Sequence, residues 1–433
     1  MTLLAPDLMR PLLAAPVAVL GAGASGRAVR ALLGKLGVSG VIFDEKIQAD
    51  GIVNNFPLVS ARQHRLVVFS PGFPPDHPWL KTARAAGAEC LGELDFAALF
   101  WRGEILAITG TNGKTTLTEF LTHALQSTGC DARATGNIGY PFSQLVAETD
   151  GGAPGMVAVC EISSFQAETL RHLRPSATFW ANFAEDHLER HPGLDAYFSA
   201  KWTLLERTPP SAAFIGSTVQ SHAQVSGRKL PVATQVISEV KTPNPALAGT
   251  VFAAYPQYEN YMLAQAWWRH SGRPSAALEA AARTFRLGRH RLSRVAEIEG
   301  VTWWNDSKAT NFHAVEAALA SFASPVLVIL GGKAKGGNLA GFIQRIAPRV
   351  QRAFVLGETK DILGTFCSVY RVPCTVCSTL AEAVQLAAES ARRGDHILLS
   401  PGFASFDLFR SYEDRGNQFE TLVNNLGATA TLR

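Results

Sequence analysis

Short apolar runs alternate with amphipathic stretches along most of the chain, and the pattern is clear from the start. Pro16–Leu20 is an apolar run that predicts a strand, and an apolar-periodic stretch from Arg27 to about Leu36 predicts a helix. Val41–Phe43 and Leu66–Phe69 predict two more strands. Strands that alternate with helices indicate a parallel α/β sheet. We expect this first unit to end near Leu94.

The same pattern begins again in the middle of the chain. Glu104–Ile108 predicts a strand, and a glycine-rich loop and a helix with apolar residues at helical spacing follow it. Met156–Cys160 and Thr178–Ala181 predict further strands. The segment Pro209–Ala248 is rich in Ser, Thr, Val and Pro, and we interpret it as short strands and loops of the same domain.

A third unit is predicted to begin around Gly288, with strands at Thr302–Trp304, Pro325–Leu330, Ala353–Leu356 and His396–Leu399. We therefore predict an α/β protein of three domains. Residues 1–94 would form an N-terminal Rossmann-like domain, 95–287 a central P-loop ATPase-like domain with a parallel sheet, and 288–433 a C-terminal Rossmann-like domain. Ligands of open α/β sheets bind at the carboxyl ends of the strands, so function is expected there.

Composition supports a folded protein and excludes several classes. The chain has 433 residues, enough for about three domains, of which 47% are hydrophobic and 18% charged. The net charge of +4, without a run of five Lys or Arg residues, does not indicate nucleic-acid binding, although it suits anionic small molecules. No apolar run reaches the roughly 20 residues of a membrane span. We expect a cytoplasmic monomer without a targeting peptide.

The six cysteines are few and scattered, which fits the cytoplasm. Cys374 and Cys377 have the spacing of metal ligands, but no second pair accompanies them. We interpret both as ordinary thiols rather than as a redox or metal site.

A glycine motif follows the first predicted strand. Gly21-x-Gly23-x-x-Gly26 opens a helix, whose N-terminal N–H groups favour a phosphate or diphosphate, and Asp44 lies 18 residues further on, where it could bind a ribose or uridine group. Taken alone, the motif favours NAD over a UDP group. A tight turn needed only for packing is the alternative.

A phosphate-binding loop follows the strand of the middle unit. It reads Thr109-Gly110-Thr111-Asn112-Gly113-Lys114-Thr115-Thr116. Glycines allow backbone N–H groups to surround a phosphate, the lysine reaches the β- and γ-phosphates, and a threonine hydroxyl can bind Mg²⁺. The motif departs from the usual pattern at Ile108, where a glycine is expected, but it still predicts ATP binding.

Polar residues also follow the next two strands. Glu161 comes directly after Met156–Cys160, where a carboxylate suits a hard cation, and His187 follows Thr178–Ala181 after a few residues. A solvated glutamate beside a serine cap is the ordinary alternative for Glu161. Lys201, considered alone, is typical of a solvated helix face.

Together these strings resemble the Mur ligase family. Their order along the chain matches, from the phosphate loop through Asn137-Ile-Gly, Glu161-Ile-Ser-Ser-Phe-Gln, Glu185-Asp-His-Leu-Glu-Arg-His and Ser199-Ala-Lys. His290-Arg, Leu330-Gly-Gly and Leu399-Ser-Pro continue the match. Asn305-Asp-Ser-Lys-Ala-Thr-Asn and Ser405-Phe-Asp with Arg415-Gly are similar to the glutamate-adding branch. The resemblance extends from about Val17 to Leu422.

The resemblance implies an ADP-forming ligase that adds D-glutamate to UDP-N-acetylmuramoyl-L-alanine through an acyl phosphate in peptidoglycan precursor synthesis. It implies ATP, two Mg²⁺ ions and a carbamylated Lys201, and it makes the first glycine loop a UDP site. By the same resemblance, Lys114, Glu161, His187 and Lys201 are catalytic, and Thr115, Glu161, His187 and Lys201 are metal ligands. The expected nucleotide contacts are Gly110, Thr111, Asn112, Gly113, Lys114, Thr115, Thr116, Asn260, Arg291 and Asp306. The expected contacts of the UDP-sugar are Ser25, Asp44, Gly72 and Asn137, and those of the amino acid are Lys308, Thr310, Lys335, Ser405 and Tyr412.

The chain departs from the family pattern in several places. Tyr258 and Glu259 precede Asn260 where the family often has Gly-Arg-His, Lys46 stands at a common arginine, and Gly402 and Phe403 replace an Ala-Cys pair. Three other functions compete: an NAD-dependent oxidoreductase, a non-catalytic nucleotide-binding protein, and a related ligase for folate, L-glutamate or another amino acid. The first leaves the phosphate loop unexplained, and the retained Lys114, Glu161, His187 and Lys201 argue against the second.

Overall fold

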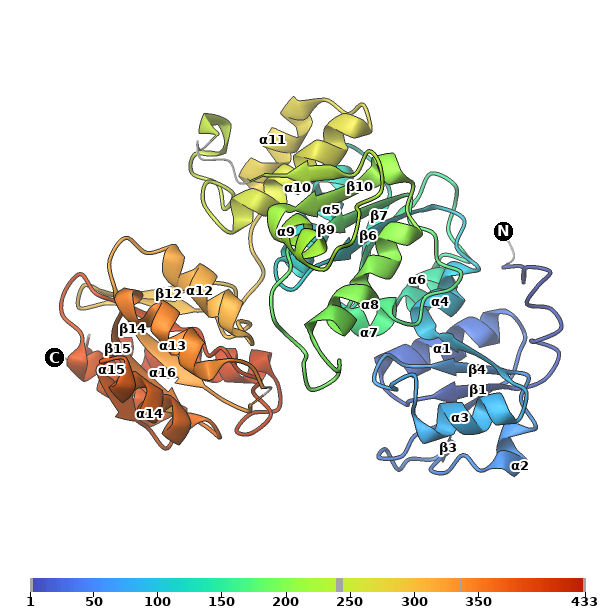
Figure 1. The fold of residues 1–433 in the computed structure, drawn as a ribbon, viewed down its shortest axis with the longest axis horizontal. Coiled ribbons are helices and arrows are strands. Elements are labelled where there is room, and N and C mark those ends of the chain that lie inside the picture. Colours follow the sequence, from blue (N-terminus) through green and yellow to red (C-terminus); the bar gives the residue numbers. More distant parts are fainter. Residues whose placement is uncertain (1–2, 239–243, 335, 431–433) are drawn as a thin grey trace. The chain divides into compact units, whose positions relative to one another are not determined.

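The computed structural model describes residues 3–238, 244–334 and 336–430. This part of the chain contains three β-sheets, each packed with helices (Figure 1). The chain divides into two compact units. The first comprises residues 1–183, 195–241 and 259–284 and holds the first two sheets, whereas the second comprises residues 184–194, 242–258 and 285–433 and holds the third sheet. The predicted boundaries of three domains, at 94 and 287, stay a prediction.

The first sheet is fully parallel and has the strand order β3-β2-β1-β4-β5. Alternate residues of β1 enter different cores: Val17 and Val19 pack with α1 on one face, whereas Ala18 and Leu20 pack with α2 and α3 on the other. Burial on both faces is the reason why the strands read as continuous apolar runs. The elements are β1 (Val17–Leu20), α1 (Ala24–Lys35), β2 (Gly40–Phe43), β3 (Ile52–Val53), α2 (Leu58–Ala61), β4 (Leu66–Phe69), α3 (Pro78–Ala85), β5 (Glu89–Gly92) and α4 (Glu93–Ala98).

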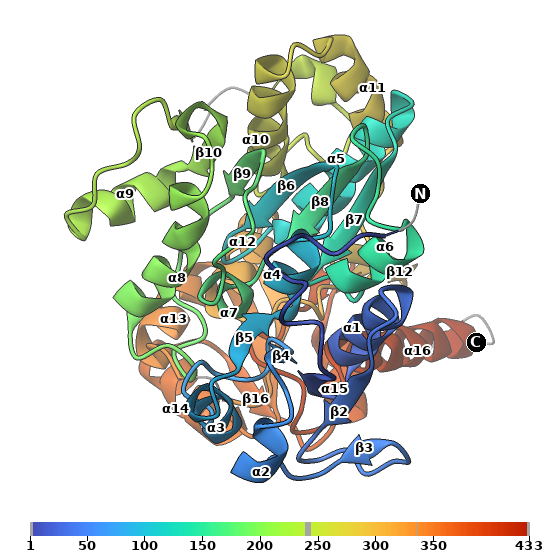
Figure 2. The ribbon, with the colours of Figure 1, turned by 90° about the vertical axis from the view of Figure 1, so that its right-hand side faces the viewer.

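The second sheet is also parallel, in the order β11-β10-β9-β6-β8-β7, and β6, β8 and β7 lie side by side in Figure 2. One hydrophobic core joins it to the first sheet, because α1 and α4 pack against α6. The elements are β6 (Glu104–Thr109), α5 (Lys114–Ser127), β7 (Ala132–Gly136), α6 (Phe142–Glu148), β8 (Val157–Glu161), α7 (Ser164–Ala167), β9 (Ala177–Trp180), α8 (Leu194–Glu206), β10 (Ala213–Gly216), α9 (Ser217–Val225), β11 (Gln235–Ile237), α10 (Gln257–His270) and α11 (Ser275–Thr284).

The third sheet has the order β12-β13-β17-β14-β15-β16, and β12 is its only antiparallel strand within the described residues. Side chains of β14 alternate between a core with α12, α13 and α14 and a core with α15 and α16. The elements are β12 (Ser293–Ile298), β13 (Val301–Asn305), α12 (Phe312–Ala320), β14 (Val326–Gly331), α13 (Leu339–Ile346), β15 (Val350–Leu356), α14 (Lys360–Val369), β16 (Cys374–Val376), α15 (Leu380–Ser390), β17 (His396–Leu399) and α16 (Tyr412–Ala430).

The structure confirms the α/β class and the strands predicted from apolar runs, with ends that shift by a residue or a few. The first helix begins at Ala24 rather than Arg27. The interpretation of Pro209–Ala248 as strands and loops alone was wrong, because Ser217–Val225 is a helix. Only Val219 and Ala223 of this helix are buried, so its apolar face is too narrow to produce a clear helical period.

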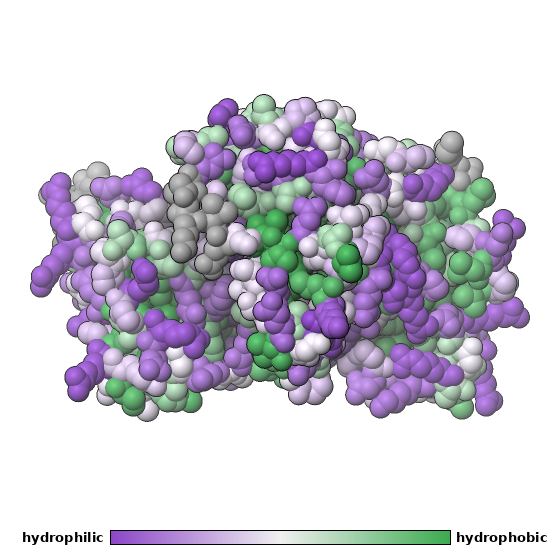
Figure 3. Space-filling model, turned by 45° about the horizontal axis from the view of Figure 1, so that its top comes forward, coloured by the Kyte–Doolittle hydropathy of each residue, from purple (hydrophilic) through white to green (hydrophobic). Residues whose placement is uncertain are grey.

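Hydrophilic residues predominate on the face drawn in Figure 3, with hydrophobic residues in smaller groups between them. Within the residues that the structure describes, no helix is long and apolar enough to cross a membrane.

Candidate active site

The phosphate loop connects β6 to α5 at the carboxyl edge of the second sheet. Gly110 and Gly113 have φ values of +149° and +80°, which favour glycine, and Gly113 caps the helix. Asn182, after β9, fixes the loop because its side-chain oxygen accepts from the Asn112 N–H at 2.9 Å. The Lys114 ammonium folds back over the loop and donates to the carbonyl oxygens of Gly110 at 3.0 Å and Thr111 at 2.9 Å. The lysine and the α5 N-terminus therefore provide positive charge for an anion at this loop.

Lys201 is not a solvated lysine, because its side chain is only 1% exposed. Its Nζ donates to the carbonyl oxygen of Gly110 at 2.9 Å and to Thr109 Oγ1 at 3.3 Å. The ring of Tyr197, one turn earlier on α8, lies 4.8 Å from Nζ, and the Tyr197 hydroxyl is 3.2 Å from Thr111 Oγ1. The structure thus brings Lys201 from α8 to the base of the phosphate loop.

Glu161 ends β8, and its backbone pairs with Ile108 of β6. The side chain is 2% exposed. Its Oε1 accepts from Asn137 Nδ2 at 3.1 Å, but its Oε2 is buried and has no hydrogen-bond partner in the part of the chain that the structure describes. Buried carboxylate oxygens normally have a partner, so this atom is suited to a cation. Ser163 caps α7 just beyond, as expected of a serine in this position.

Asn260, on α10, belongs to the same edge. Its side chain is 3% exposed and packs against Gly113, where a Cβ atom would lie 2.8 Å from Asn260 Oδ1. Four groups of predicted site residues therefore converge in the first unit. They are the phosphate loop with Thr115 and Thr116, Lys201, Glu161 with Asn137, and Asn260.

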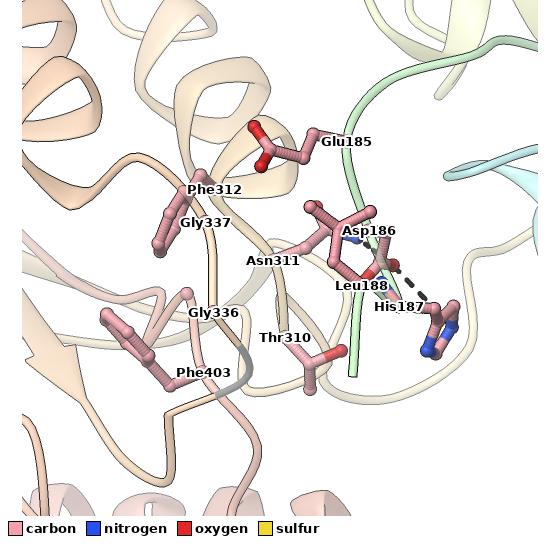
Figure 4. A pocket seen from close by; sticks show the side chains of 11 residues that line it. Glu185, Asp186, His187, Leu188, Thr310, Asn311, Phe312, Gly336, Gly337 and Phe403 are labelled. Carbon is pink, nitrogen blue, oxygen red and sulfur yellow. Dashed lines mark hydrogen bonds and ion pairs between the residues drawn. The ribbon is translucent and has the colours of Figure 1, made fainter. Parts of the chain in front are cut away.

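A pocket in the second unit contains other predicted residues (Figure 4). His187 and Thr310 both line it. Asp186 connects their two loops, because its Oδ2 accepts from Asn311 Nδ2 at 3.0 Å and its Oδ1 accepts from the His187 N–H at 2.9 Å. The His187 Nδ1 lies 3.2 Å from Glu189 Oε1. The complete lining is Glu185, Asp186, His187, Leu188, Thr310, Asn311, Phe312, Gly336, Gly337, Gly402 and Phe403.

Asp306 follows β13 in the same unit. Its Oδ2 accepts from Ser400 Oγ at 2.8 Å, and its Oδ1 accepts from the Leu292 N–H at 3.1 Å. Burial raises the pKa of Asp306 to about 7, against the opposing effects of these hydrogen bonds and of the charges of Arg291 and Arg415. The carboxyl group therefore titrates near neutral pH.

Of the other predicted amino-acid contacts, Lys308 and Ser405 follow β13 and β17, and Tyr412 begins α16. The Lys308 ammonium is 5.2 Å from the centre of the Tyr412 ring, and Ser405 is buried. Lys335 lies outside the described residues. The prediction missed Arg415, which is fully buried at the start of α16; its presence in the Arg415-Gly416 string was the available signal.

The first glycine loop is held by Asp44. A Cβ at Gly26 would lie 1.7 Å from the carbonyl oxygen of Gly21, so the close turn requires glycine. The Asp44 carboxylate accepts from the Ala22 N–H at 2.7 Å and from two N–H groups of its own loop. Burial acts to raise its pKa, but these bonds outweigh burial and lower it. Ser25, in the first turn of α1, is partly exposed, and Gly72 after β4 is exposed.

All six cysteines are free thiols, and Cys374 lies against Cys367. Among the described residues, no group of three or more His, Cys, Asp or Glu side chains could hold a metal ion by itself. A cation at Glu161 would thus need hydroxyl or phosphate oxygens as further ligands.

Comparisons with known proteins agree with this arrangement. Residues 108–243 match the Mur ligase middle domain, and residues 290–403 match the Mur ligase, glutamate ligase domain. UDP-N-acetylmuramoylalanine–D-glutamate ligase from Pelotomaculum thermopropionicum is 32% identical, with 95% of this chain and 97% of that protein covered. The enzyme of the same name from Chlamydia pneumoniae is 34% identical, with 95% and 99% covered.

Solved structures share the multi-domain fold. UDP-N-acetylmuramate–alanine ligase from Thermotoga maritima matches with a TM-score of 0.59 and 15% identity over 95% of this chain and 99% of that chain. The MurF ligase from Thermotoga maritima, solved in complex with ADP, matches with a TM-score of 0.57 and 14% identity over 94% and 95% of the two chains. On the strength of the curated relatives and the two domain matches, this chain belongs to the Mur ligase family.

Proposed function

We propose that this chain is an ATP-dependent, ADP-forming ligase that adds D-glutamate to UDP-N-acetylmuramoyl-L-alanine in peptidoglycan precursor synthesis. The observation that carries the proposal is the convergence of Lys114, the buried Lys201 and the buried Glu161 at the edge that bears the phosphate loop. The near-complete coverage of relatives that bear this enzyme name supports the choice of substrates.

The first step joins two anions. A carboxylate oxygen of the UDP-linked substrate attacks the γ-phosphorus of ATP, the bond from that phosphorus to the bridging oxygen breaks, and ADP leaves with the electron pair. Such a transfer depends mainly on positioning and charge neutralisation. Lys114 supplies positive charge at the loop, and the N–H groups at the start of α5 orient the phosphates.

The second step forms the amide. The amine nitrogen of glutamate attacks the carbonyl carbon of the acyl phosphate and loses a proton, and the carbon–oxygen bond to phosphate breaks. Lys308, Thr310, Lys335, Ser405 and Tyr412 are the proposed contacts of the amino acid. A hydroxyl or ammonium donor can bind its carboxylates, and the Tyr412 ring beneath Lys308 limits where that ammonium can lie.

The residues of the first unit fit a Mg²⁺ ion. Glu161 Oε2 is a buried carboxyl oxygen without a hydrogen-bond partner among the described residues, and the buried Thr115 directly follows Lys114 of the phosphate loop. Bound there, Mg²⁺ would neutralise phosphate charge. Glu161 and Thr115 would hold one ion. His187 and the carbamate of Lys201 are the proposed ligands of a second ion.

Carbamylation of Lys201 is part of the proposal because an ammonium would repel a cation at this edge. Addition of the neutral amine to CO₂, with loss of one proton, forms a carbamate whose oxygens a hard cation prefers. Burial supports the reaction, since desolvation favours the neutral amine.

The other assignments follow the family. Asn260, Arg291 and Asp306 would bind the nucleotide together with the phosphate loop. Ser25, Asp44, Gly72 and Asn137 would bind the UDP-sugar. Asp44 accepts hydrogen bonds from backbone N–H groups of the glycine loop and of its own loop. Its proposed role is therefore to hold the glycine loop in the shape that binds the diphosphate. A cytoplasmic monomer remains part of the proposal.

The test is a product assay with purified protein. ADP and phosphate should appear only when UDP-N-acetylmuramoyl-L-alanine and D-glutamate are both present, and L-glutamate should serve as the paired control. Formation of AMP and pyrophosphate would overturn the mechanism, and equal use of L-glutamate would overturn the assigned stereochemistry.

A further inference from the structure

Arg415 is among the largest fully buried side chains and lies in the first turn of α16. Its guanidinium is held by neutral oxygens. Nε donates to Ser307 Oγ at 3.0 Å, Nη2 donates to the Ser307 carbonyl oxygen at 2.8 Å, and Nη1 donates to the Phe403 carbonyl oxygen at 3.2 Å. A buried arginine usually pairs with a carboxylate, so this arrangement calls for an explanation.

Within the described residues, Arg415 makes no ion pair with a carboxylate. Burial lowers the pKa of Arg415 to about 10, although the charges of Asp407 and Asp306 oppose the change. The guanidinium is therefore charged at neutral pH, and its planar fork reaches three acceptors from three separate nitrogen atoms, whereas a lysine has only one nitrogen.

The three acceptors belong to segments that carry proposed site residues. Ser307 lies between Asp306 and Lys308, and its hydroxyl donates to the Tyr412 carbonyl oxygen at 2.8 Å. Phe403 lies two residues before Ser405. Arg415 thus ties the segments after β13 and β17 to the start of α16, from positions 108 and 12 residues away along the chain.

A second set of contacts holds the same junction. Asn305 Nδ2 donates to the Gly416 carbonyl oxygen at 3.0 Å, and its Oδ1 accepts from the Ser307 N–H at 3.1 Å. A Cβ at Gly416 would lie 2.3 Å from His290 Nδ1, so the residue after Arg415 must be glycine for His290 to pack there. The long side chain of Arg415 and the lack of a side chain at Gly416 therefore both serve to hold the same junction.

We propose that Arg415 is a positioning residue for the amino-acid half of the reaction. It sets the geometry of Lys308 and Ser405 by fixing the two segments that bear them. This inference rests on the proposed function, because it assumes that these two residues contact glutamate. A positioning error of about an ångström can reduce a rate by roughly a hundredfold, so small shifts of these segments matter.

Arg415→Lys keeps the charge and removes the fork. In a coupled ADP-release assay, we expect the KM for glutamate to rise by roughly tenfold or more. The KM for UDP-N-acetylmuramoyl-L-alanine, whose proposed contacts lie in the first unit, should stay within twofold or so of wild type. Arg345→Lys, an exposed arginine that binds Glu316 from α13, is the matched control and should leave all constants unchanged.

Ser307→Ala is the second variant, because it removes only the acceptor of Nε and the donor to Tyr412. It should also raise the KM for glutamate, and its effect should not add to that of Arg415→Lys in the double variant. Additive effects, or equal rises in the KM of both substrates, would overturn the positioning role. If Arg415→Lys does not fold, an unchanged KM for glutamate in Ser307→Ala overturns the proposal by itself. Failure of the wild-type protein to join glutamate at all would instead refute the proposed function.

Discussion

Lys201 in the first unit and Arg415 in the second are both almost fully buried cations near the carboxyl edge of a sheet. Carbonyl and hydroxyl oxygens accept hydrogen bonds from each: Gly110 and Thr109 for the lysine, Ser307 and Phe403 for the arginine. The two differ in what burial can do to them. A buried amine can become neutral and react, whereas a guanidinium keeps its proton and its planar fork.

This difference in protonation distinguishes a residue that can take part in the reaction from one that can only hold other residues in place. In the proposed function Lys201 is the nucleophile toward CO₂, and its single nitrogen can rotate toward a new partner. Arg415 cannot react in this way, but it can connect two chain segments at once. We infer that in this protein a buried lysine indicates chemistry and a buried arginine indicates support, and the following variants test that comparison.

The largest effect is expected for Lys114→Ala, which removes a lysine that must stay charged. Turnover should fall by roughly a thousandfold or more, because the γ-phosphate loses a positive contact in the transition state. Binding of UDP-N-acetylmuramoyl-L-alanine, followed by calorimetry, should stay near normal. Lys229→Ala, an exposed lysine of the same unit, is the control. Loss of UDP-substrate binding in a folded Lys114→Ala protein would contradict the separation of the two sites.

Lys201→Ala should lower turnover by roughly a hundredfold, since it removes a proposed charged group near the transferring phosphoryl group. Formate or acetate should restore part of the activity by replacing the carbamate, and removal of bicarbonate should slow the wild-type enzyme. Activity close to wild type at ordinary Mg²⁺ would show that the lysine has no catalytic role.

Lys201→Arg separates charge from reactivity at the same position. If the reaction needed only a buried positive charge at this position, Lys201→Arg should turn over substrate, and its rate should depend on bicarbonate no more than the wild-type rate does. We expect it to be as inactive as Lys201→Ala, because a guanidinium does not form the carbamate. Thermal unfolding of both variants checks that neither loss comes from misfolding.

The sequence predicted contiguous features better than dispersed ones. The phosphate loop and the strands that precede it lie within short segments, so local pattern and glycine placement were sufficient. Arg415 acquires its role from Ser307, 108 residues earlier, and from the close contact of Gly416 with His290, and neither is visible in local spacing. Strand β12 was missed for a related reason: it is an antiparallel edge strand with no buried residue, so its side chains show no apolar run.

Asp306→Asn extends the comparison from buried cations to a buried carboxyl group. The pKa of Asp306 is raised to about 7 by burial, so the stability linked to its protonation is complete below about pH 4 and is lost as the pH rises to about 7. The midpoint of thermal unfolding of wild type, relative to Asp306→Asn, should therefore fall between pH 5 and pH 7 and then level off. ATP binding by the variant should also weaken, by roughly tenfold. A pH-independent difference in midpoint would mean that the carboxyl group is ionised throughout.

The smallest effect, with the opposite sign, is expected for Asp44→Asn. Burial disfavours the Asp44 carboxylate, but the N–H groups of Ala22, Ile47 and Lys46 outweigh it and lower the pKa. The stability from ionisation is therefore present at neutral pH and is lost as the pH falls through and below about 4, the range of an ordinary aspartate. Asp44→Asn should unfold a few degrees below wild type at pH 7, and the deficit should stay nearly constant down to about pH 4 and shrink as the pH falls further.

Asp50→Asn, which changes an exposed aspartate of the same loop, is the matched control and should show no such trend. Two aspartates that each follow a strand would then respond to pH in opposite directions, because backbone N–H groups surround one and burial dominates the other. If the deficit of Asp44→Asn grew on acidification, the N–H bonds would not be the source of its stability, and its role in holding the glycine loop would have to be abandoned.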